Sequence, residues 1–231
     1  MRRAATVILV LIVVLVVGGV VLDRLMVART EDELLATARE HVELADDADV
    51  VIDGFPFLTQ VLAGRLAEVR GESTALVTEG MELRDVRVTA RGVQPEEPYR
   101  AETVEINAEV PVATLRSALA DAVDLPGDPL SLDVADGVMQ LGVDVAGLEL
   151  TALVDPVVVG GAVALELGEV MVAGASVPRP VVDALADQLG DVRLEIPGLP
   201  DGLVPTRLAV GADGLEVRLA GTDVELGAWM G

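Results

Sequence analysis

The chain has 231 residues, no cysteine, one histidine and a formal net charge of −23. Without cysteine it has neither disulfides nor thiolates for catalysis or metal binding. A chain this acidic, with no basic cluster to offset the charge, repels phosphate backbones, and this excludes nucleic acid as an expected partner. Any contact with lipid is expected to be apolar and local.

An uncharged apolar run opens the chain. Ala4–Leu22 contains 19 residues without a charge; at about 1.5 Å per residue it spans roughly 28 Å, close to the thickness of a bilayer's hydrocarbon core. Two arginines precede the run and Asp23 follows it, so the N-terminus is expected in the cytoplasm. A cleaved signal peptide is the alternative, but its apolar core is shorter. We predict an uncleaved anchor over residues 1–28 and an extracytoplasmic domain over residues 29–231.

The segment after the anchor is predicted to be a second helix. Thr30–Glu33 matches a capping box, in which the first and last side chains each bond the other's backbone N–H. Helical spacing of apolar residues then continues to about Ala45. The aspartates that follow lack the glycine and glutamate of an EF-hand loop, so we expect a turn there and no metal site.

Val50–Arg65 brings both phenylalanines of the chain to one corner marked by glycine and proline. Phe55 and Phe57 flank Pro56, and an apolar helical segment follows, with Leu58, Val61 and Leu62. Burying a phenylalanine is worth roughly 1.5–3 kcal/mol. Two interpretations stay open on the residues alone: the corner plugs the end of a core, or it contacts a ligand.

From Arg65 onward the pattern favours strands. In Tyr99–Val110 apolar and polar residues alternate, which is typical of an antiparallel strand with one wet face. A short helix is predicted from Pro111 to Ala122. Further strands are predicted at Ser131–Ala135, Gly137–Val143, Leu148–Val154, Val157–Val172 and Val192–Ile196, a helix at Pro178–Leu189, and a hairpin around Asp213-Gly214.

The predicted fold class is α+β, because consecutive strands without intervening helices form antiparallel sheets. We expect an N-terminal transmembrane helix, then a long, curved antiparallel β-sheet with two or three amphipathic helices. Small aliphatic side chains on such a sheet leave a concave apolar face suited to acyl chains. An ordinary, tightly packed core is the alternative.

Catalytic signatures are missing from the sequence. It has no G-x-S-x-G elbow, no lysine and no second histidine, so serine–lysine and cysteine chemistry are excluded and a serine triad would need His41. No glycine-rich phosphate loop with a lysine is present. Carboxylate pairs for glycoside cleavage would lack the aromatic platforms that hold sugars. We predict neither an enzyme nor a cofactor.

Two stretches resemble a known family. GFPFLTQVLAGRLAEVR (Gly54–Arg70) and LRDVRVTARGV (Leu83–Val93) are similar to the LmeA-like family of phospholipid-binding proteins of actinobacterial envelopes. The resemblance implies an elongated, lipid-cradling domain of the tubular lipid-binding kind and phospholipid binding outside the plasma membrane. The family's motif falls on Gly54–Gln60, and no catalytic residues carry over.

These observations predict a membrane-anchored, extracytoplasmic phospholipid-binding protein that holds acyl chains in an apolar groove and supports maintenance of envelope lipids or lipoglycans. The expected lipid-binding residues are Phe55, Phe57, Leu58, Val61 and Leu62. The expected partners are phospholipid and the plasma membrane, with an envelope protein as a further candidate. The alternative function is a non-catalytic scaffolding protein of the envelope, with a dry core, that binds a partner protein.

Overall fold

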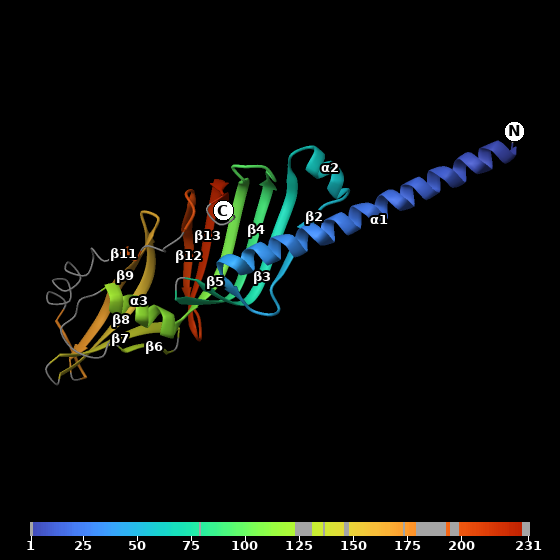
Figure 1. Cartoon of the computed structure of the whole chain (residues 1–231). Coiled ribbons are helices and arrows are strands. Elements are labelled where there is room, and N and C mark those ends of the chain that lie inside the picture. Colours follow the sequence, from blue (N-terminus) through green and yellow to red (C-terminus); the bar gives the residue numbers. More distant parts are fainter. Residues whose placement is uncertain are drawn as a thin grey trace.

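The computed structural model describes residues 2–78, 80–122, 131–135, 137–145, 148–172, 174–178, 193–194 and 199–227. These residues form two antiparallel sheets, one long helix and two short helices (Figure 1). The predicted class, mostly antiparallel strands with few helices, is therefore confirmed. The single long sheet that we expected is instead two sheets.

The first sheet has the strand order β1-β3-β4-β5-β13-β12, and β2 also pairs with β3. Its strands are β1 (Glu43–Leu44), β2 (Asp49–Asp53), β3 (Leu66–Thr78), β4 (Met81–Val93), β5 (Arg100–Pro111), β12 (Leu203–Val210) and β13 (Gly214–Glu225). The predicted hairpin at Asp213-Gly214 joins β12 to β13, with Val210 opposite Leu215. Because β2 pairs only with β3, its other backbone edge is open to a different partner.

The second sheet has the order β10-β9-β8-β7-β6, and β11 pairs with β9. Its strands are β6 (Ser131–Ala135), β7 (Val138–Val145), β8 (Leu148–Val159), β9 (Ala162–Val172), β10 (Ala175–Ser176) and β11 (Arg193–Leu194). The predicted helix after β5 is present as α3 (Val112–Ala122), and it lies between the sheets, against β5, β6 and β13. A helix at this point turns the chain out of the first sheet, so β6 begins a new one.

The long helix, α1 (Arg2–His41), overturns the prediction of two separate N-terminal helices. No glycine or proline interrupts the chain between Leu22 and His41, and Thr30 lies inside the helix, where its hydroxyl donates to the Met26 carbonyl at 3.0 Å. Helix-forming neighbours therefore override the capping-box pattern. Among the residues whose side chains are described, no helix is both long and apolar enough to cross a bilayer, so the expected transmembrane helix is not found there.

The predicted break at Asp155-Pro156 is also wrong, because β8 continues through Pro156 to Val159 and turns at Gly160–Gly161. The pairing of β8 with β7 ends at Val154, whereas its pairing with β9 continues past Pro156. Proline is tolerated where a strand has a free edge, since its missing N–H is not needed there. The helix predicted at Pro178–Leu189 falls, apart from Pro178, outside the described residues.

The largest buried cluster joins the two sheets and α3. Leu119 of α3, Leu132, Met139 and Val154 of the second sheet, and three leucine or valine side chains of β13 share it. The predicted wet face of β5 is confirmed: Val104 is buried, while Glu105 on the opposite face forms an exposed ion pair with Arg218 at 3.3 Å. Exposed pairs of this kind contribute about 0–1 kcal/mol, so apolar burial holds the sheets together.

We expect Leu132→Ala to lower the free energy of unfolding by about 2–5 kcal/mol, because Leu132 is 1% exposed and its loss leaves a cavity between the sheets. The matched control is Leu62→Ala, which removes the same atoms from a side chain that is 89% exposed and should change stability by less than about 0.5 kcal/mol. Chemical denaturation of the full chain in detergent measures both. Equal effects of the two substitutions would contradict this assignment of the core.

Candidate binding site

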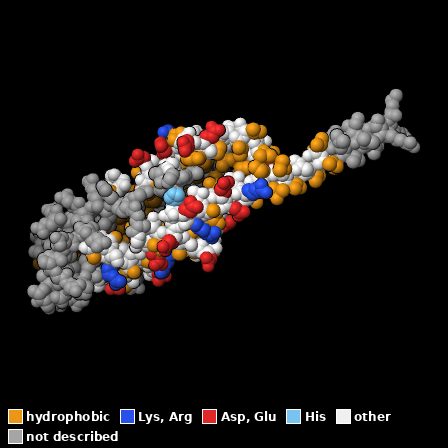
Figure 2. Space-filling view, in the orientation of Figure 1, with side chains coloured by type: hydrophobic (Ala, Val, Ile, Leu, Met, Phe, Trp, Pro, Cys, Tyr) orange, Lys and Arg blue, Asp and Glu red, His pale blue; other side chains and the backbone are white. Residues whose placement is uncertain are grey.

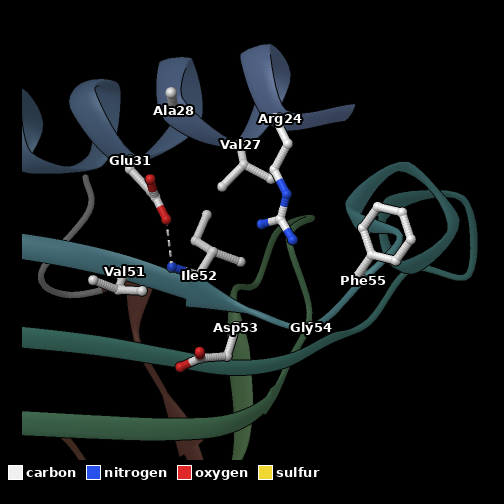
Figure 3. Close-up of a pocket in the computed structure, with 9 residues that line it drawn as sticks. All are labelled: Arg24, Val27, Ala28, Glu31, Val51, Ile52, Asp53, Gly54 and Phe55. Atoms are coloured by element: carbon white, nitrogen blue, oxygen red, sulfur yellow. Dashed lines mark hydrogen bonds between the residues drawn. The ribbon is translucent and has the colours of Figure 1, made fainter. Parts of the chain in front are cut away.

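A pocket of about 400 Å³, open to solvent, lies between α1 and the β2–α2 corner, where α2 is Phe57–Leu62. Arg24, Val27, Ala28 and Glu31 line it from α1, and Val51, Ile52, Asp53, Gly54 and Phe55 line it from the corner. In Figure 3, Val27 and Ile52 point toward each other across it, while Asp53 points away from α1. The pocket therefore lies at the corner that the sequence singled out, but it is more polar than the apolar groove we expected.

Two carboxylates hold α1 against this corner. Glu31 accepts a hydrogen bond from the backbone N–H of Ile52 at 2.8 Å, on the open edge of β2 (Figure 3). Asp23 is buried and accepts one from the N–H of Leu58 at 2.9 Å. That N–H belongs to the first turn of α2, whose own N-cap residue is Pro56 and supplies no side-chain cap. Asp23 thus caps α2 from another helix, satisfying a donor that would otherwise lack a partner.

The Gln60 side chain links the two chain segments that flank the corner through hydrogen bonds. Its side-chain NH₂ donates to the Asp53 carbonyl at 3.3 Å, and its side-chain oxygen accepts from the N–H of Ala67 at 2.7 Å. Gly54 has φ +106°, and a Cβ there would lie 2.6 Å from the Gln60 amide nitrogen. Only glycine meets both conditions without strain. The glycine and glutamine of GFPFLTQ therefore fix the backbone that lines the pocket.

The two phenylalanines have different environments. Phe57 is 3% exposed and shares a buried cluster with Val27, Ile52 and Leu66, against which Leu58 packs. Phe55 lines the pocket and is 55% exposed. Val61 and Leu62, also expected to contact lipid, are exposed on α2. The structure thus brings Phe55 to the pocket, places Phe57 and Leu58 in the packing behind it, and leaves Val61 and Leu62 on the surface.

Most residues of the site were not expected from sequence, among them Asp23, Arg24, Glu31 and Ile52. Asp23 was interpreted only as the charge that ends the apolar run, and Glu31 only as part of a capping box. Their spacing carries a signal, because Asp23, Val27 and Glu31 recur every four residues and so share one helix face. This face therefore carries two hydrogen-bond acceptors on either side of an apolar side chain, the set that contacts the corner.

Arg24 gives the pocket its cation. Its guanidinium carbon lies 5.3 Å from the centre of the Phe55 ring, a cation–π distance, and it forms no ion pair with any described residue. The two lining carboxylates have other partners: Glu31 bonds to Ile52, and Asp53 lies 2.7 Å from the Arg70 guanidinium. No cluster of potential metal ligands occurs among the described residues. A guanidinium beside apolar walls suits an anionic amphiphile.

The fold and the pocket define a binding protein: antiparallel sheets, a long helix clamped to one sheet edge, and a mixed polar and apolar pocket between them. The chain belongs to the LmeA-like phospholipid-binding family, whose model matches residues 21–220. The match includes every residue of the pocket and the Asp23 contact. No curated protein and no solved structure matches the chain.

Phe57→Ala is expected to lower the free energy of unfolding by about 3–5 kcal/mol, because it empties a buried site between α1 and β2. Phe55→Ala serves as the matched control. Since its ring is mostly exposed, we expect its loss to cost less than about 1 kcal/mol, the size of an exposed cation–π contact. Thermal and chemical denaturation of the two variants provide the measurement, and a larger loss for Phe55→Ala would refute this division of roles.

Asp23→Ala is expected to cost about 0.5–2 kcal/mol, the usual loss when a helix cap is removed. Asp23→Asn keeps an oxygen acceptor at the same place and should retain most of the stability. Hydrogen exchange at the Leu58 amide localises the effect, because that N–H loses its acceptor only in the alanine variant. If the asparagine variant exchanged as fast as the alanine variant, the carboxylate charge rather than the hydrogen bond would be responsible.

Proposed function

We propose that this protein is a membrane-anchored, extracytoplasmic phospholipid-binding protein that acts without catalysis in maintaining lipids or lipoglycans of the cell envelope. The observation that carries the proposal is the family match over residues 21–220, which includes the whole pocket. Phospholipid binding is the property that gives this family its name, and the pocket supplies a location for it on this chain.

The pocket's chemistry supports a phospholipid as its occupant. Arg24 is placed to contact a phosphate, since a guanidinium matches the geometry of phosphate oxygens and holds its charge at any physiological pH. Val27, Ile52 and Phe55 supply the apolar wall for the first part of an acyl chain. Ligand pockets commonly measure about 300–1,000 Å³, and this one, at about 400 Å³, can take part of one lipid. Phe57 and Leu58 hold that wall in place.

Membrane anchoring is supported by the N-terminal part of α1. Ala4–Leu22 carries no charge, and the large apolar side chains described from Val13 to Leu22 are all exposed. In Figure 1 this end of the helix projects beyond both sheets. An exposed apolar surface of this extent is costly in water and favourable in a bilayer. With the N-terminal arginines inside, the sheets lie on the extracytoplasmic side.

We expect purified full-length protein to carry phospholipid, detected by native mass spectrometry and by lipid extraction. Ala28→Trp should reduce the bound lipid several-fold, because an indole at this exposed, pocket-lining position fills the site. The matched control is Ala36→Trp, at an exposed position of the same helix outside the pocket. Lipid content should stay at the wild-type level in the control.

A protein that arrives free of lipid and takes up none from vesicles would overturn the proposed function and favour the scaffolding alternative. Equal lipid content in Ala28→Trp, Ala36→Trp and wild type would show that the lipid is held elsewhere on the chain.

A further inference from the structure

An exposed apolar surface adjoins the pocket where α1 passes α2. It comprises Leu22 and Met26 of α1, Phe55 of the corner, and Val61 and Leu62 of α2, and we call it the apolar tip. Figure 2 shows hydrophobic side chains gathered at this place, while acidic and basic side chains are scattered over the surface further along the molecule. Leu62 alone is 89% exposed, which is unusual for a leucine on a helix that also contributes to the core.

We infer that the apolar tip docks onto the bilayer that holds the N-terminal run, with α2 and Phe55 seated among the lipid headgroups. This inference rests on the membrane anchoring proposed above. It adds a second contact between the domain and the membrane, next to the pocket and sharing Phe55 with it.

The first argument is the rigid spacing along α1. The uncharged run ends at Leu22, and the helix continues without interruption to the residues that bind α2. At about 1.5 Å per residue, Met26 lies about 6 Å beyond Leu22. The headgroup region on each side of a bilayer is roughly 5–7 Å thick. Because Asp23 ties the first turn of α2 to α1 within this distance, α2 has no room to stand clear of the membrane surface.

The second argument is continuity of the apolar surface. Exposed apolar side chains run along α1 from Val13 to Met26 and continue onto Phe55 and α2, while Asp23, the first acidic residue in this region, is buried. The Asp23 carboxylate, whose charge would oppose entry into the headgroup layer, is thus buried between α1 and α2. Interfacial binding grows with the apolar area that is buried, and Arg24, beside Phe55, is a cation that can contact lipid phosphates at the same level.

The third argument is charge. At a net charge of −23 the molecule is repelled from an anionic membrane surface, so electrostatic attraction cannot orient the domain. An apolar contact at one end can do so, because it brings few acidic residues near the headgroups. A second copy of the chain is the other occupant to consider for such a surface, and the experiment below separates the two.

The test uses the absence of native cysteine, which permits labelling at one chosen position. Leu62→Cys carries an environment-sensitive fluorophore in the full chain, reconstituted into phosphatidylcholine vesicles with or without brominated acyl chains. The matched control is Arg207→Cys, an exposed position on β12 at the opposite edge of the first sheet. We expect the label at position 62 to lose most of its emission in brominated vesicles, and the label at position 207 to lose none.

Flotation of the same vesicles distinguishes a failure of tip docking from a failure of the proposed membrane anchor. If the protein floats and the label at position 62 is not quenched, docking of the tip is overturned while the anchor stands. A blue-shifted label that brominated lipid does not quench would indicate a second copy on the tip, which also overturns it. If the protein does not float, the proposed anchoring fails and tip docking fails with it.

Discussion

Two hydrogen bonds from one helix face determine the arrangement on which the rest of the site depends. Asp23 and Glu31 of α1 each accept from a backbone N–H of the β2–α2 corner, and Val27 between them packs into the same buried cluster as Ile52 and Phe57. A helix at the open edge of a sheet needs such acceptors, because the edge presents unpaired N–H groups. Together with the packing of Val27, they fix the position of α1, which forms one wall of the pocket.

The same contacts leave an arginine available in the pocket of an acidic protein. Glu31 bonds to the Ile52 N–H and Asp53 pairs with Arg70. Asp23 is buried and bonds to the Leu58 N–H of α2. Arg24 forms neither a hydrogen bond nor an ion pair with any described residue. Its charge is held near the Phe55 ring, so polar and apolar recognition sit side by side. This pairing suits a phospholipid, whose phosphate and acyl chains are joined within one molecule.

Local patterns predicted much of this fold. Alternation identified β5, and the Asp213-Gly214 turn of the β12–β13 hairpin and the helix after Phe57 follow from neighbouring residues alone. The failures are non-local. The pattern at Thr30 predicted a helix start, but helical residues on both sides keep Thr30 inside α1. Pro156 does not interrupt β8, because the pairing of β8 with β7 stops at Val154 and no N–H is needed on that edge. The Asp23–Leu58 contact joins residues 35 positions apart, so no window of sequence contains it.

The unbroken course of α1 also limits how far the domain can travel. A flexible linker would let a tethered domain sample a wide volume and exchange lipid with distant acceptors. Here the helix that leaves the proposed anchor is the helix that builds the pocket, so the two move as one body. In the anchored form the pocket stays at the surface of its own membrane. In that proposed form, a phospholipid bound in the pocket would stay next to this membrane for as long as it stays bound.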